Sequence, residues 1–96
     1  MKTARVLISG FVQNVGFRHF VKSKAAELGL KGWVRNLPAG RQGLPDGRVE
    51  ALCQGSKEKI EKIIKLCKKG PFLSEIEEVD VHWENVIDKF EDFVIL

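Results

Sequence analysis

GFVQNVGFR, residues 10–18, joins an alternating apolar segment to a segment with helical periodicity. The first predicts a strand over residues 4–12, and the second predicts a helix over residues 18–29 that ends at Gly29. A glycine-containing loop between a strand and a helix can turn its N–H groups toward an anion, and the helix N-terminus adds partial positive charge. Arg18, at the end of the loop, supplies a planar fork of donors that suits phosphate oxygens. The segment therefore suggests an anion-binding loop; the alternative is a simple turn with a surface arginine.

The rest of the chain supplies a second helix and further strands. The helix begins after the N-cap Ser56 and ends at Gly70-Pro71. Apolar alternation predicts strands over residues 31–37, 47–54, 76–84 and 92–96. This order, βαββαβ plus a short C-terminal strand, is typical of the ferredoxin-like α+β fold, with an antiparallel sheet and two helices on one face. The fold alone does not specify a function.

Composition indicates one small soluble domain. The chain has 96 residues, 30% of them charged, and a net charge of +3, which suits a small anionic ligand without requiring nucleic acid. It has no apolar run long enough to span a membrane, and its N-terminus does not resemble a signal peptide, so we expect a cytoplasmic protein. Cys53 and Cys67 lack metal-ligand spacing, and their apolar surroundings favour buried free thiols over a disulfide.

The segment at residues 10–18 resembles the first signature of the acylphosphatase family. The matching residues are Gly10, Val12, Gln13, Val15, Gly16, Phe17 and Arg18. Phe11 stands where the family usually has Arg, and Asn14 where it usually has Gly. Asn tolerates left-handed backbone angles better than most residues, so the loop can keep its shape.

A second segment resembles the other signature of that family. GWVRN, residues 32–36, matches its first half, and Gly47, Val49 and Gly55 match its second half. Ten residues separate Asn36 from Gly47, seven more than in the family pattern. We therefore predict a single acylphosphatase-like domain over residues 1–96 with a loop insertion at 39–45, where turn-forming residues suit a hairpin tip.

The resemblance implies an enzyme that hydrolyses small acyl phosphates to carboxylate and phosphate. It implies Arg18 and Asn36 as catalytic residues, with Asn36 positioning the attacking water. It also implies a phosphate-binding loop made of Gln13, Asn14, Val15, Gly16, Phe17 and Arg18. No cofactor or metal is implied; inorganic phosphate is expected as product and competitive inhibitor. A monomer is expected, with neither nucleic acid nor membrane as a partner.

Several alternatives remain open at this stage. Asn36 can instead cap a turn at the end of its strand, since Asn is a common turn residue. His19 invites interpretation as a general base, but successive residues of a first helical turn point in different directions, so we expect it to face elsewhere. The alternative function is a non-catalytic or weakly catalytic anion-binding module of the same fold. An RNA-binding sheet is less favoured, because no basic and aromatic platform surrounds Phe11.

Overall fold

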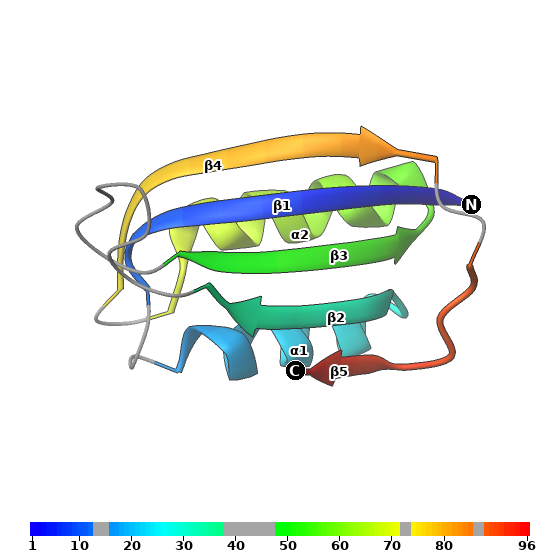
Figure 1. The fold of residues 1–96 in the computed structure, drawn as a ribbon, viewed down its shortest axis with the longest axis horizontal. Coiled ribbons are helices and arrows are strands. Elements are labelled where there is room, and N and C mark those ends of the chain that lie inside the picture. Colours follow the sequence, from blue (N-terminus) through cyan, green and yellow to red (C-terminus); the bar gives the residue numbers. More distant parts are fainter. Residues whose placement is uncertain (13–15, 38–47, 72–73, 86–87) are drawn as a thin grey trace.

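The computed structural model describes residues 1–12, 16–37, 48–71, 74–85 and 88–96. Two helices lie together on one face of a five-stranded sheet (Figure 1). In chain order the elements are β1 (Lys2–Phe11), α1 (Phe17–Glu27), β2 (Lys31–Asn36), β3 (Val49–Gly55), α2 (Lys57–Lys69), β4 (Glu75–Glu84) and β5 (Phe93–Ile95). The predicted ferredoxin-like α+β fold is confirmed.

The strand order in the sheet is β4-β1-β3-β2-β5. β1 pairs antiparallel with both β3 and β4, and β2 pairs antiparallel with β3. One detail of the prediction needs correction: the sheet is not wholly antiparallel, because β5 runs parallel to β2. β4 ends beside Thr3, at the end of the sheet where β2 begins (Figure 1). Because β5 starts from that same end, it runs in the same direction as β2.

Each helix buries one apolar stripe against the sheet. α1 buries Phe17, Val21 and Ala25. α2 buries Ile60, Ile63, Ile64 and Cys67. Ser56 caps α2, its side chain accepting a hydrogen bond from the Lys59 N–H at 3.3 Å. Neither described helix combines the length and the apolar character needed to cross a membrane.

The apolar core lies between these helices and the inner face of the sheet. Its strand residues include Ala4, Val6 and Ile8 from β1 and Val49, Ala51 and Cys53 from β3, all with at most 1% exposure. Cys53 and Cys67 are both free and buried. Burial raises the pKa of each thiol to about 12, and for Cys53 the nearby Cys67 contributes further. The predicted buried free thiols are confirmed.

The opposite face of the sheet carries a chain of charged side chains. The Glu50 carboxylate, only 6% exposed, lies 2.7 Å from Arg35 and 3.5 Å from Arg5. Arg5 also contacts Glu84, at 3.1 Å. Arg35 therefore points away from the helix-bearing face, as its alternation with Val34 and Asn36 predicts.

A β-bulge bends β1 just before the loop that the sequence singles out. The register between β1 and β4 shifts between Ser9 and Gly10. Gly10 has φ 128°, and a Cβ there would collide with the Glu75 backbone, so only glycine fits without strain.

Candidate active site

The N-terminus of α1 presents backbone N–H groups that have no partner within the helix, at one end of the sheet. Gly16 is its N-cap residue, in the left-handed region with φ 76° and ψ 18°. The first intrahelical bond runs from the Phe20 N–H to the Gly16 carbonyl, at 3.0 Å. The N–H groups of the first turn have no carbonyl partner within the helix, and that turn contains no acidic residue. The electrostatics of this turn therefore favour an anion.

Arg18 and Asn36 line the same hollow, although one belongs to α1 and the other to β2. The hollow has a volume of about 250 Å³ and is lined by Val12, Gly16, Phe17, Arg18, His19 and Asn36. The start of α1 and the end of β2 lie at the same end of the molecule (Figure 1). None of the described residues that line it carries a carboxylate, so Arg18 gives this part of the hollow a positive character.

The side-chain carbonyl of Asn36 meets no donor among the described residues. Its Oδ1 atom is buried and accepts no hydrogen bond from the described part of the chain. Leaving such an atom unpaired costs about 1–3 kcal/mol. No donor among the described residues gives Asn36 a capping role. Because Asn36 lines the hollow, a bound molecule there can supply the missing donor.

Sequence reasoning missed one residue of the hollow. His19 is exposed and lines the same space as Arg18, whereas we expected it to face elsewhere. The side chains of the first helical turn are distributed around the end of the helix, so two consecutive residues can both contact a ligand bound there. The loop residues Gln13, Asn14 and Val15 lie outside the described residues, as does the predicted insertion at 39–45.

Comparison with known proteins identifies the family. A family model described as acylphosphatase matches residues 4–95. The chain belongs to the acylphosphatase family. Among curated acylphosphatases, one from Chloroflexus aurantiacus is 43% identical over 97% of this chain and 94% of its own length. Another, from Acaryochloris marina, is 45% identical over 96% of this chain and 90% of its own length.

The solved structures agree with the sequence relatives. The crystal structure of an acylphosphatase from Bacillus subtilis matches with a TM-score of 0.86 and 30% sequence identity. The match covers 100% of this chain and 99% of that one. The predicted membership of the acylphosphatase family is confirmed over nearly the whole chain.

Proposed function

We propose that this acylphosphatase hydrolyses small acyl phosphates by holding the phosphoryl group at the start of α1 and attacking it with a water held by Asn36. Family membership identifies the chain as an enzyme of the acylphosphatase type. The observation that supports the mechanism is the shared hollow, which is lined by the first turn of α1 and by Asn36, whose Oδ1 meets no donor among the described residues.

The phosphoryl group is assigned to the helix end. The N–H groups of the first turn and the Arg18 guanidinium would donate to its equatorial oxygens, and the predicted loop residues 13–15 would contribute further N–H groups. The N–H groups of the first turn of α1 are held by the helix before the substrate arrives, so they would stabilise developing charge without reorganising. Left-handed geometry at Gly16 sets the direction of these donors.

The attacking water is assigned to Asn36. Its Oδ1 would accept one hydrogen of the water and thereby orient the water's lone pair toward phosphorus. The new bond forms between the oxygen of the water and phosphorus, while the bond from phosphorus to the acyl oxygen breaks on the opposite side. The electron pair of the broken bond leaves with the carboxylate, and one proton of the water passes to a phosphoryl oxygen.

This chemistry needs no strong acid or base from the protein. The leaving group is a carboxylate, which is stable as an anion and requires no protonation. An amide is a poor base, so transfer of the proton to the substrate itself is consistent with Asn36 at this position. Inorganic phosphate, which resembles the bound group, is expected to inhibit competitively. We further expect a cytoplasmic monomer that acts without nucleic acid or membrane.

Hydrolysis of benzoyl phosphate, followed with and without inorganic phosphate, tests the proposal. We expect turnover by the native chain, competitive inhibition by phosphate, and a large loss of rate in Arg18→Ala. The matched control is Lys22→Ala, which removes an exposed positive charge from the same helix one turn further on. Phosphate binding without turnover by the native chain would instead favour the anion-binding module. Equal rates in the two variants would refute the role of Arg18.

A further inference from the structure

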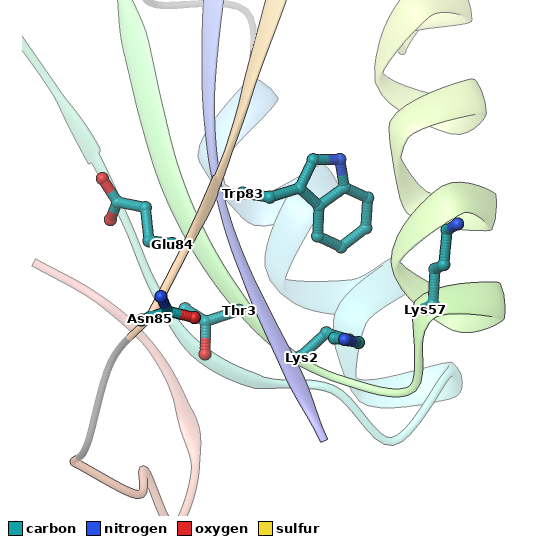
Figure 2. A pocket seen from close by; sticks show the side chains of 6 residues that line it. All are labelled: Lys2, Thr3, Lys57, Trp83, Glu84 and Asn85. Carbon is teal, nitrogen blue, oxygen red and sulfur yellow. The ribbon is translucent and has the colours of Figure 1, made fainter.

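A second hollow lies at the opposite end of the sheet from Arg18. It has a volume of about 260 Å³ and is lined by Lys2, Thr3, Lys57, Trp83, Glu84 and Asn85 (Figure 2). Lys2 begins β1 and Lys57 begins α2, whereas the candidate active site lies where β1 ends (Figure 1). The proposed hydrolysis makes no use of this hollow.

An exposed indole forms one wall of this second hollow. Trp83 is 46% exposed, although it alternates with Val79 and Val81, which pack against the core. In Figure 2 its ring extends into the space between β4 and α2, beside the side chains of Lys2 and Lys57. An aromatic face open to solvent is a stacking surface for a planar ring.

The charges around the indole are unequally distributed. Lys2 and Lys57 extend on the side of the strands that faces α2, whereas the Glu84 side chain points to the other side (Figure 2). Glu84 is already paired there with Arg5, at 3.1 Å. Neither lysine forms an ion pair with a carboxylate in the described part of the chain. The wall that carries the indole therefore presents two ammonium groups to a ligand.

We propose that this hollow binds a nucleoside monophosphate, with the base stacked on Trp83 and the phosphate held by Lys2 and Lys57. A planar ring and a separate anionic group together match the two features of the wall. A neutral aromatic molecule would leave the lysines unused, and a simple anion would leave the indole unused. At about 260 Å³ the hollow is slightly smaller than typical pockets for drug-sized ligands, roughly 300–1,000 Å³, which favours a mononucleotide over a larger ligand.

Adenosine monophosphate is the probe that tests this site. Its binding is followed through the indole N–H signals in two-dimensional NMR spectra of the protein. The chain has two tryptophans, so Trp83→Phe assigns the signals and Trp33 serves as the internal control. We expect the Trp83 signal to shift saturably with a Kd of about 1 mM or tighter, while the Trp33 signal stays in place. Adenosine and inorganic phosphate, each added alone, are expected to shift it much less.

The second arm of the test substitutes residues that line this hollow and measures the affinity for adenosine monophosphate by calorimetry. Lys57→Ala is expected to weaken adenosine monophosphate binding roughly two- to fivefold, as befits one exposed charge pair. The matched control Lys62→Ala, at an exposed position of the same helix, is expected to leave it unchanged. Trp83→Ala is expected to weaken binding at least about fivefold, because stacking is lost. Benzoyl phosphate hydrolysis should be unaffected in all three variants.

Three results would overturn this site. The first is an unmoved Trp83 signal at about ten times the expected Kd. The second is shifts confined to Gly16, Phe17 and Arg18, which would place the nucleotide in the candidate active site. The third is a Trp83 signal that moves with protein concentration alone, which would make the exposed indole a contact between copies of the chain. Arg18→Ala separates the two sites, since it should weaken phosphate binding and leave the Trp83 response intact.

Discussion

Arg18 in the first turn of α1 and Asn36 at the last residue of β2 line one hollow, with the Oδ1 of Asn36 buried and unpaired by the described residues. The two side chains are brought together because α1 packs across the sheet and β2 returns along it (Figure 1). One supplies positive charge and the other an acceptor. This division of roles leads to distinct expectations for their substitution.

Arg18→Ala should abolish most hydrolysis while leaving the fold intact. Arg18 is only half-buried, so its removal leaves no core cavity. Loss of one donor to developing charge typically lowers kcat about 100- to 1,000-fold. Arg18→Lys should also be severely impaired, because an ammonium cannot reproduce the planar fork. Steady-state kinetics with circular dichroism as the folding control measure both variants; near-native turnover in folded Arg18→Ala would contradict the assignment.

Asn36→Ala should lower kcat far more than it weakens the binding of inorganic phosphate. The reason is that Asn36 is assigned to the water, whereas Arg18 is assigned to the anion. The inhibition constant of phosphate, measured beside kcat, separates these roles. If phosphate affinity collapses while kcat is preserved, the roles of the two residues are reversed.

His19→Ala should retain most of the hydrolytic rate even though His19 lines the hollow. A general base contributes about 100- to 10,000-fold, so its loss would be unmistakable. We expect a much smaller change in kcat, and a change in KM if the imidazole borders the acyl group. Addition of a chelator should likewise leave the rate unchanged. A loss of about 100-fold in either experiment would require general-base or metal-assisted chemistry.

Deletion of residues 39–45 should give a folded and active enzyme. The deletion joins Pro38 to Asp46 and leaves a short connection, Leu-Pro-Asp-Gly, in which the turn-forming order Pro-Asp-Gly is kept. Loop length affects stability only weakly, so the unfolding free energy should change little. Thermal unfolding and benzoyl phosphate turnover measure the outcome. Failure of the shortened chain to fold would show that the alignment of the second signature is misplaced.

Buried thiols should make the fold sensitive to alkali. Burial raises the pKa of Cys53 and Cys67 to about 12, whereas thiols of the unfolded chain ionise near about 8.5. Their protonated state thus supports folding fully below about pH 8.5, and this contribution is lost as the pH rises toward 12. At about pH 10 the loss is about 2 kcal/mol per thiol.

Urea unfolding at neutral pH and at about pH 10 measures this sensitivity. Cys67→Ala is the control, because it removes one thiol and should lose less stability between the two conditions. Titrating lysines affect both proteins equally, and the chain contains no tyrosine. Identical pH dependence in the two proteins would rule out the Cys67 thiol as a cause.

Much of this structure could be predicted from the sequence, because local patterns determined it. The stripe of α2 and the cap at Ser56 follow helical periodicity and capping chemistry. The direction of β5 could not be predicted in this way, since it depends on which end of the sheet the chain reaches after β4. His19 was missed because residue spacing gives the direction of a side chain from its helix but not the shape of the hollow beside it. Trp83 followed the apolar alternation of β4 yet remained half exposed, because it borders a hollow beside the start of α2.

β4 forms one outer edge of the sheet, and its composition has a consequence for concentrated solutions. Its acidic residues are Glu75, Glu77, Glu78, Asp80 and Glu84. A second molecule that tried to extend the sheet by pairing its own β4 would bring like charges directly opposite one another, which destabilises cross-strand pairs. The other edge, β5, is only three residues long and offers little to pair with. A sheet with two such edges resists growing into fibres while it remains folded.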